Sequence, residues 1–292
     1  MAPKMTPVIA LRNILRDLLC QFRMHGALWR RLGFVLSYYR SYANHRRRGL
    51  SQADSRLEAL GEMARLGLSS RIVRVRLPNG AQAEVDLSTA SFLAKELLID
   101  LEYGRLPQFR PHPGQTVVDV GAHQGLFTLD SALRVGPSGH VVSIEASPKN
   151  ARLLEQNIFL NGLSHVKAIH TAAGDSPRED ILHETNLASG GHSLSRQLIA
   201  GEREKRTPRQ VRVDTLDHIL ELAGFNRADL IKIDVEGFCL NVLKGATKTL
   251  ASRPRLVMEV EGGAEEIAKV REHVEALGYR VVAFNAILYA EV

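Results

Sequence analysis

The stretch TVVDVGAHQGLFTL, residues 116–129, places an acid and two glycines between two apolar segments. An apolar run ends on Asp119, Gly121 and Gly125 stand four residues apart, and apolar residues return at helical spacing from Leu126. Glycine lets a chain turn sharply and brings bare backbone against a ligand. In an open α/β sheet, ligands bind beyond the carboxyl ends of the strands. The stretch therefore predicts a strand, a ligand-binding loop and a helix.

A second acid closes the next apolar run. Glu145 follows Val141–Ile144, about 20 residues beyond the glycine loop, where a carboxylate can accept hydrogen bonds from ribose hydroxyls. Ser147 then suits a helix N-cap, and Pro148 suits the first turn of that helix. Together with the glycine loop, this acid predicts a nucleoside ligand.

The glycine spacing separates this loop from other nucleotide sites. A nicotinamide dinucleotide favours G-x-G-x-x-G, with its pyrophosphate at the helix N-terminus, whereas no third glycine follows Gly125 in register. The sequence also lacks the G-x-x-x-x-G-K-[ST] phosphate loop and a Tyr-x-x-x-Lys pair for dehydrogenase chemistry. An acid two residues before Gly121 favours a ligand with a cationic amino group and little anionic charge. S-adenosylmethionine fits this description.

Strand and helix patterns alternate around these motifs. Such alternation is typical of a parallel sheet covered by helices on both faces. The final FNAILYAEV is too short for another crossover helix, so it is predicted to return as an antiparallel strand. The segment Asp175–Val213, which contains GEREKRTPR, is interpreted as an exposed insertion loop. We expect strands at 116–120, 141–144, 166–169, 230–233, 256–260 and 279–282, and helices at 126–133, 148–160, 240–250 and 264–277.

Two segments precede this α/β domain. RIVRVRLPNGAQAEVDLS predicts a β-hairpin with an Asn79-Gly80 turn, because apolar and polar residues alternate on both sides of the turn. A helix-like stretch around Ala90–Leu101 follows, and three prolines in RLPQFRPHPGQ indicate a boundary near residue 113. The predicted division is a basic amphipathic helical extension at 1–70, the β-hairpin and connecting helix at 71–113, and the α/β domain at 114–292.

Positive charge is concentrated at the N-terminus. Residues 1–50 hold ten lysines and arginines and one acid, a net charge of +9; because the whole chain carries +6, residues 51–292 carry −3. In the same segment Val8, Leu11, Leu15, Leu18 and Phe22 recur at helical spacing, which predicts an amphipathic helix. Its apolar face can dock on the protein itself, lie on an anionic membrane as a peripheral contact, or bind another partner. An organelle-targeting peptide, rich in arginine and poor in acids, is a further alternative.

The cysteine content and the hydrophobic segments indicate in which cellular compartment the protein is expected. Cys20 and Cys239 lie too far apart in sequence to build a disulfide framework or a CxxC zinc pattern, which favours a reducing compartment. No window reaches the roughly 18 apolar residues of a membrane span, and no signal-peptide pattern opens the chain. The expected location is the cytoplasm, with membrane contact through residues 1–50 as the peripheral alternative. Nothing in the sequence sets the oligomeric state.

Four sequence blocks resemble the FkbM-type family of S-adenosylmethionine-dependent methyltransferases. They lie within about residues 97–260, and IKIDVEG followed by VLKGA is the most specific of them. The resemblance implies a class I methyltransferase (Rossmann-like) fold, whose seven-stranded, mostly parallel sheet has an antiparallel last strand. The four blocks are VVDVGAHQGLFTL; VVSIEASPKNARLLEQNIFLNGL; GGHSL with VRVDTLDHIL; and DLIKIDVEGFCLNVLKGA with RLVMEVEGG beyond.

The chain departs from the family pattern at two places. His123 stands where the family usually has Asn, and because both residues tolerate unusual backbone conformations the loop should be retained. Phe238-Cys239 replaces a common Ala-Glu pair, which removes one acid beside the predicted site and leaves the acceptor's contacts open. The first 70 residues or so lie outside the resemblance.

In the class I fold that the resemblance implies, the end of the fourth strand lies beside the first. We therefore expect the Asp234 carboxylate to face the transferred methyl group and Glu236, two residues on, to stand at the mouth of the same crevice. We assign Asp234 to positioning the cofactor amine or the acceptor, and Glu236 to binding the acceptor or removing its proton. His192 in GGHSL is the alternative base. A divalent metal held by Asp234, Glu236 and Glu259 or Asp217 is a weaker alternative, and no metal is included in the prediction. The predicted cofactor contacts are Asp119, Gly121, Ala122, His123, Gly125, Glu145, Ala146, Ala172, Ala173 and Asp234.

The expected activity is S-adenosylmethionine-dependent methyl transfer (EC 2.1.1.-). As the resemblance implies, the expected reaction is O-methylation of a hydroxyl on a small molecule, sugar, lipid-linked or secondary-metabolite acceptor. The alternatives are an N-methyltransferase acting on a peptide or nucleic acid, and a non-catalytic cofactor-binding module. Sequence-specific nucleic-acid binding is disfavoured, because no [DN]-P-P-[YF] motif occurs, aromatic residues are few and the excess charge is confined to the N-terminus.

Overall fold

The computed structural model describes residues 14–15, 17–19, 21–93, 101–185, 190–195 and 206–292. The chain forms two compact units, the first comprising Met1–Leu101 with Asn186–Ser189, and the second Glu102–Thr185 with Gly190–Val292. The predicted boundaries at residues 70 and 113 stay predictions.

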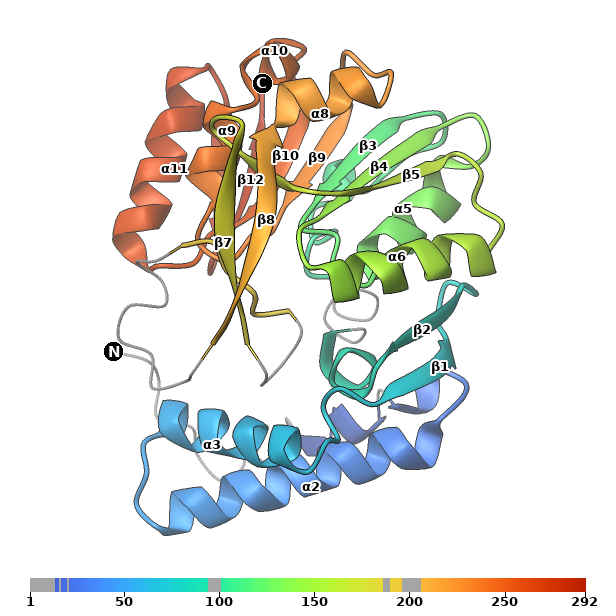
Figure 1. The fold of residues 1–292 in the computed structure, drawn as a ribbon, viewed down its shortest axis with the longest axis vertical. Helices are drawn as coiled ribbons and strands as arrows, with labels where there is room; N and C mark the ends of the chain where they lie inside the picture. The colour runs from blue at the N-terminus through green and yellow to red at the C-terminus, as the bar shows by residue number, and fades with distance from the viewer. Residues whose placement is uncertain (1–13, 16, 20, 94–100, 186–189, 196–205) are drawn as a thin grey trace. The chain divides into compact units, whose positions relative to one another are not determined.

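The second unit is built on a seven-stranded sheet in the order β11-β12-β10-β9-β3-β4-β5 (Figure 1). The last strand, β12, runs antiparallel to both of its neighbours, and the other strand pairs are parallel, as predicted. The strands are β3 (Thr116–Val120), β4 (His140–Glu145), β5 (Val166–His170), β9 (Leu230–Ile233), β10 (Arg255–Glu259), β11 (Arg280–Phe284) and β12 (Ile287–Glu291).

The two central strands are joined across a long separation in sequence. Val117 of β3 pairs with Leu230 of β9, and the Thr116 amide donates to the Asp229 carboxylate at 2.8 Å, 113 residues away. Because β9 lies beside β3, the loops that follow both strands meet at one edge of the sheet. The candidate site lies at this edge.

Helices cover the sheet through apolar contacts. Alternate residues of the strands, such as Val118 and Val120 of β3, pack into one core with the helices α8 to α11. Helices α5 and α6 pack against β3, β4 and β5. The helices are α5 (Leu126–Val135), α6 (Pro148–Leu160), α8 (Leu216–Leu222), α9 (Cys239–Lys244), α10 (Thr247–Ala251) and α11 (Ala264–Ala276).

The predicted single helix at 240–250 is wrong, because the structure has two short helices there. The helical conformation is interrupted at Gly245, which packs so closely on β6 that an added Cβ would lie 1.9 Å from the carbonyl oxygen of Gly174. Asp217 then caps α10, since its carboxylate accepts from the amides of Lys248 and Thr249 at 2.8 Å each. The Asp217 carboxylate is therefore occupied by the N-terminus of α10, and it is not among the carboxylates that lie close together in the candidate site.

The interpretation of 175–213 as a loop is also wrong. A three-stranded sheet in the order β6-β8-β7 occupies much of this segment. The cause is cross-strand pairing of polar residues, as in Arg209–Glu184 at 2.8 Å, over a small apolar cluster that includes Leu182 and Val213. Parts of this segment, 186–189 and 196–205, lie outside the described residues. The strands are β6 (Ala172–Gly174), β7 (Arg178–Glu184) and β8 (Thr207–Thr215).

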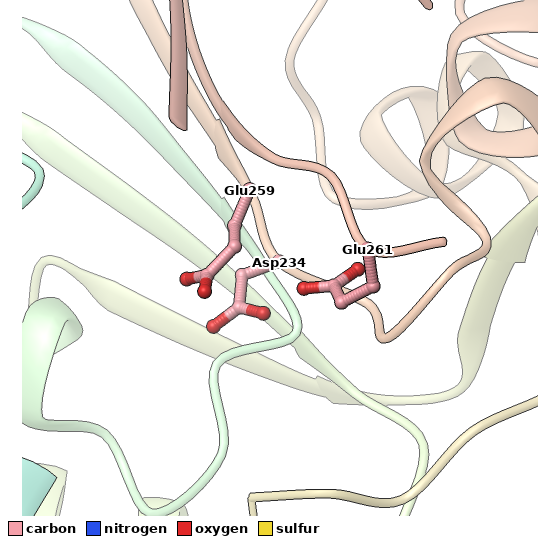
Figure 2. Close-up of side chains that lie close together, drawn as sticks. All are labelled: Asp234, Glu259 and Glu261. Carbon is pink, nitrogen blue, oxygen red and sulfur yellow. The ribbon is translucent and has the colours of Figure 1, made fainter. Parts of the chain in front are cut away.

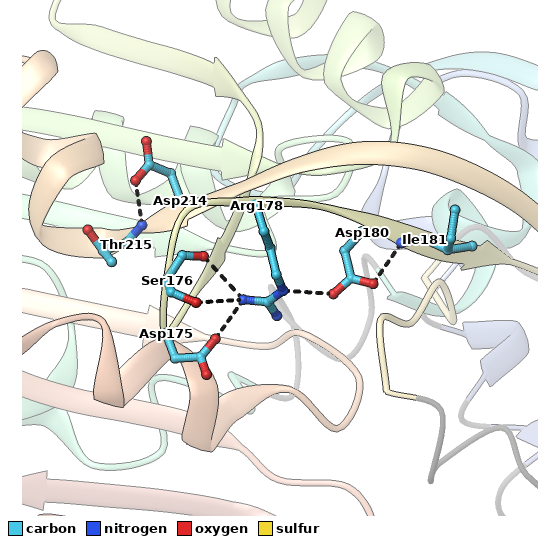
Figure 3. A network of polar contacts seen from close by, with 7 residues as sticks. All are labelled: Asp175, Ser176, Arg178, Asp180, Ile181, Asp214 and Thr215. Carbon is cyan, nitrogen blue, oxygen red and sulfur yellow. Dashed lines mark hydrogen bonds and ion pairs between the residues drawn. The ribbon is translucent and has the colours of Figure 1, made fainter.

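A polar network fixes the start of this small sheet (Figure 3). The guanidinium of Arg178 lies 2.7 Å from the carboxylate of Asp175 and 3.1 Å from that of Asp180. The same guanidinium stacks over the ring of Phe238, 5.7 Å from its centre. Arg178 therefore ties the turn between β6 and β7 to the segment that follows β9.

The first unit contains two helices and the predicted hairpin. Val73 pairs with Val85 across the hairpin and both are buried, while Arg74 and Glu84 form an ion pair on the other face. The hairpin prediction is thus confirmed. The elements are a 3-10 turn at Gln21–Arg23, α2 (Leu28–Arg47), α3 (Gln52–Arg65), β1 (Ile72–Arg76), β2 (Gln82–Asp86) and a π-helical turn at Thr89–Leu93.

Two N-terminal predictions fall partly outside the described residues. Of the predicted helix at 90–101, residues 90–93 belong to the π-helical turn and 94–100 lie outside. Of the predicted apolar face, Val8 and Leu11 lie outside, whereas Leu15 and Phe22 are exposed. What this face contacts therefore stays a prediction.

Candidate active site

The glycine loop is pressed against the end of β9. Gly121 has φ +75°, and a Cβ on it would lie 1.7 Å from the carbonyl oxygen of Asp234. The amides of Gly121 and Ala122 both donate to the Ile144 carbonyl at 2.9 Å, which ties the loop to β4. His123 has φ +53°, so it adopts the unusual backbone conformation that the sequence analysis expected it to tolerate. The first glycine is thus required by a neighbouring strand end.

A buried lysine on β9, Lys232, supports the glycine loop through a hydrogen bond to the loop backbone. The Nζ atom of Lys232 donates to the Gly121 carbonyl at 2.7 Å and lies 3.0 Å from Asp119 Oδ1 and 3.7 Å from Asp234 Oδ2. Burial opposes the charge of Lys232, but the two aspartates outweigh it and raise its pKa. Sequence reasoning missed this residue, although a lysine inside the apolar strand LIKI was a signal.

Asp119 is fully buried beneath the loop. Its carboxylate accepts from the Thr128 hydroxyl at 2.7 Å and pairs with Lys232. As placed, the side chain does not reach the surface of the site, so its influence on a ligand passes through Lys232 and the loop backbone. The predicted contact between Asp119 and the cofactor stays a prediction.

Glu145 closes the other side of the loop. Its two carboxylate oxygens accept from the amides of His123 and Ser147, each at 2.8 Å. Burial raises the pKa of Glu145 to about 7, and the two backbone hydrogen bonds partly oppose that shift. Each oxygen can accept a further hydrogen bond. The carboxylate is thus oriented by the loop and still has capacity for two hydroxyl donors.

Three carboxylates converge where β9 and β10 end (Figure 2). One oxygen each from Asp234, Glu259 and Glu261 lies within 4.8 Å of the others, close enough to hold a cation together. Parallel neighbouring strands explain this, because residues that follow β9 and β10 reach the same edge. We call these three residues and Glu236 the acid cluster.

The acid cluster is held together against electrostatic repulsion. Burial is the main cause that raises the pKa of Glu236 to about 9 and that of Glu259 to about 8, and the charge of Asp234 adds to both shifts. Burial also raises the pKa of Glu261, whose carboxylate accepts from the Gly237 amide at 2.7 Å. Such a cluster favours a cationic ligand, since a positive charge relieves the repulsion.

The family assignment follows from the sequence match over this region. The methyltransferase FkbM domain matches residues 119–281, more than half of the chain. The chain belongs to the FkbM family of S-adenosylmethionine-dependent methyltransferases. Its sheet order, with one antiparallel strand inserted near the edge, is that of the class I methyltransferase fold.

The chain is similar to two named relatives and to one solved structure. The 31-O-demethyl-FK506 methyltransferase FkbM of Streptomyces tacrolimicus is 28% identical over 253 residues, which cover 76% of this chain and 95% of that protein. The AMB antimetabolite synthetase AmbE of Pseudomonas aeruginosa is 27% identical over 240 residues, 71% of this chain but only 11% of the synthetase. A crystal structure of methyltransferase FkbM from Methylobacillus flagellatus has a TM-score of 0.45 and 15% identity, covering 70% of this chain and 54% of that one.

The residues present fit the FkbM family's cofactor, S-adenosylmethionine. Glu145 retains acceptor capacity for ribose hydroxyls, and the glycine loop exposes backbone beside it. The acid cluster supplies negative charge, which suits a ligand that carries a cationic amino group. These features lie at the ends of β10, β9, β3 and β4, which are consecutive in the sheet.

Other predicted cofactor residues have different surroundings. Ala172 and Ala173 lie in β6, paired with β8, and their side chains are buried in apolar clusters. The contact of Ala172 and Ala173 with the cofactor stays a prediction. Ala146 lies beside Glu145 and is half-buried, and its carbonyl accepts from the His170 ring at 3.2 Å.

The His192 ring can donate a hydrogen bond from Nε2, because its other nitrogen, Nδ1, already accepts one. Its Nδ1 accepts from the Thr185 amide at 3.1 Å, and burial lowers the pKa of the ring to about 4. The neutral ring therefore carries its proton on Nε2 and has no second acceptor nitrogen. Ser193, next in the chain, donates to the Glu236 carbonyl at 2.6 Å, so this loop positions Glu236. This geometry favours Glu236 over His192 as the base.

Proposed function

We propose that the protein transfers a methyl group from S-adenosylmethionine to a hydroxyl group of a small-molecule, sugar or lipid-linked acceptor. The observation that supports this most is the direct contact between Gly121 and the backbone of Asp234, which joins the glycine loop to the acid cluster. The relative from S. tacrolimicus is named a 31-O-demethyl-FK506 methyltransferase, and the 31-O-demethyl part of that name favours an oxygen acceptor.

The acid cluster would supply what an alcohol acceptor needs. S-adenosylmethionine brings an electrophilic methyl group on a sulfonium, which is already a good leaving group. The acceptor oxygen must lie roughly 3–3.5 Å from that methyl group and in line with it, and a base that removes its proton adds roughly 10²–10⁴ in rate. We assign proton removal to Glu236 and positioning of the cofactor amine or the acceptor to Asp234.

The electrostatics of Glu236 suit this assignment. Burial and the neighbouring carboxylates raise its pKa to about 9, so the ionised carboxylate is a stronger base than an exposed one. A cationic cofactor beside Asp234 favours ionisation of the cluster, because it offsets the repulsion between carboxylates. The base would thus become available when the cofactor is bound.

Replacing Glu145 by Ala tests the cofactor site. We expect binding of S-adenosylmethionine to weaken by roughly 1.5–3 kcal/mol, because the substitution removes a charged acceptor for the ribose hydroxyls. The amides of His123 and Ser147 also lose their acceptor, so the loop is less ordered. Isothermal titration calorimetry measures the affinity, with Glu155→Ala on the exposed face of α6 as the control. An affinity for Glu145→Ala equal to that of the control would overturn this assignment.

We also propose that residues 1–50 contact an anionic membrane surface. Leu19, Phe22 and Trp29 are 66%, 60% and 82% exposed, and Arg23 and Arg30 beside them are exposed as well. Each basic side chain near an anionic bilayer contributes about 1 kcal/mol, and exposed aromatic residues suit the headgroup region. Among the helices that the structure describes, none is long and apolar enough to cross a membrane.

Trp29 is the single tryptophan of the chain, so its fluorescence reports this contact directly. With vesicles that contain phosphatidylserine at low salt, we expect the emission to shift to shorter wavelength and the protein to co-sediment. Neutral phosphatidylcholine vesicles and high salt should abolish both effects, because the attraction is electrostatic. Unchanged emission at low salt would contradict the proposal and leave the segment a structural element.

A further inference from the structure

The hydroxyl of Tyr103 lies between two carboxylates of the acid cluster. Its oxygen is 2.9 Å from Asp234 Oδ2 and 2.6 Å from Glu259 Oε2. Tyr103 is buried, 4% exposed, and it precedes the first strand of the sheet by 13 residues. A segment outside the alternating strand and helix pattern therefore contributes a side chain to the site.

The position of Tyr103 is fixed from several sides. Its ring meets that of Phe127 edge to face at 5.9 Å, and Lys232 Nζ lies 5.5 Å from its centre. The carbonyl of the preceding residue, Glu102, accepts from the hydroxyl of Tyr289 on β12. The ring thus covers the lysine that supports the glycine loop, while the hydroxyl reaches the acid cluster.

The Tyr103 hydroxyl links two carboxylates of the acid cluster. Its O–H is within donating distance of both Asp234 Oδ2 and Glu259 Oε2, so one phenolic group fixes the two side chains relative to each other. The Oδ2 atom of Asp234 also lies 3.7 Å from the buried Lys232 Nζ. Tyr103 and Lys232 therefore hold the Asp234 carboxylate from two sides.

We propose that Tyr103 is a positioning residue that holds Asp234 in the orientation in which it receives the amino group of the cofactor's methionine end. The inference rests on the proposed function and deepens it, because it assigns recognition of one part of the cofactor to a hydroxyl outside the matched sequence blocks. The charged groups that face Asp234 and Glu259 from the surrounding elements are Lys232, Asp119, Glu236, Glu261 and Glu102.

A pair of ligands that differ at the methionine end tests the inference. S-adenosylhomocysteine carries the amino acid end, whereas 5′-methylthioadenosine lacks it. We expect Tyr103→Phe to weaken binding of S-adenosylhomocysteine about tenfold, because Asp234 loses a hydrogen bond that orients its charge. Binding of 5′-methylthioadenosine should stay within about twofold of the wild type, because its contacts lie elsewhere. Both affinities are measured by calorimetry on the full chain.

Tyr279→Phe is the matched control. Tyr279 is equally buried, and among the described residues its hydroxyl has no hydrogen-bond partner, so its removal should change neither affinity. Equal weakening of both ligands by Tyr103→Phe would mean a general structural role and overturn the inference, as would unchanged binding of S-adenosylhomocysteine. Failure of the wild-type protein to bind either ligand would instead overturn the cofactor assignment itself.

Discussion

Glu236→Gln is expected to lower the rate of methyl transfer by roughly 10²–10⁴-fold, because an amide cannot take the proton of an alcohol acceptor. Asp234→Asn should lower it by about 10²-fold through loss of alignment, since a misplacement of the reacting groups is costly. Both substitutions keep the size of the side chain, and Glu236 keeps its backbone bond to Ser193. Formation of S-adenosylhomocysteine in the presence of a panel of hydroxyl acceptors measures the rate.

The exposed Glu272→Gln on α11 is the control for the loss of one negative charge. Near-normal turnover in both site variants would refute the roles assigned here. The same assay in EDTA tests whether the reaction needs a bound metal ion. The carboxylates of Asp234, Glu259 and Glu261 are close enough to share a divalent cation. Loss of wild-type turnover in EDTA would move the catalytic role from a protein base to a bound metal ion.

Gly121→Ala should be among the most damaging single substitutions in the chain. The new Cβ would lie 1.7 Å from the Asp234 carbonyl oxygen, and the residue would keep φ +75°, which alanine adopts only with strain. We expect the free energy of unfolding to fall by roughly 2–5 kcal/mol from strain and overpacking together. Urea unfolding measures the loss, and calorimetry should show that cofactor binding falls with it.

Gly136→Ala separates the effect of backbone strain from the effect of overpacking. Gly136 has φ +66° and ψ −174°, but no atom lies within 4 Å of a Cβ built on it, so only the backbone strain of roughly 1–3 kcal/mol applies. A loss for Gly121→Ala no larger than the loss for Gly136→Ala would show that the loop can move away from β9. In that case the contact between the glycine loop and the acid cluster would not be a constraint on the site.

The central strands of the sheet could be predicted from the sequence because they are buried on both faces. The apolar run at 230–233 and the helical pattern at 148–160 coincide with β9 and α6, since hydrophobic periodicity is local information. The segment 175–213 was misinterpreted for the converse reason. Its strands are rich in charged residues, and pairs such as Arg209–Glu184 become favourable only when β7 and β8 lie side by side.

The site could be predicted only in part for a similar reason. Asp234 and Glu145 stand at strand ends and carry their own signal, whereas Tyr103 lies 131 residues from Asp234 and 156 from Glu259. Nothing in the sequence around Tyr103 indicates acidic partners. Its position depends on the order of the strands, and that order brings distant segments together without a local pattern.

Because β3 must pair with β9, the candidate site can form only late in the synthesis and folding of the chain. The two strands are separated by more than a hundred residues, as the contact between Thr116 and Asp229 shows. Closing so long a loop costs conformational entropy before any contact is gained, which slows folding. On the ribosome, the glycine loop emerges well before the acids that follow β9 and β10. The growing chain therefore holds only part of the candidate site until β9 and β10 have been synthesised.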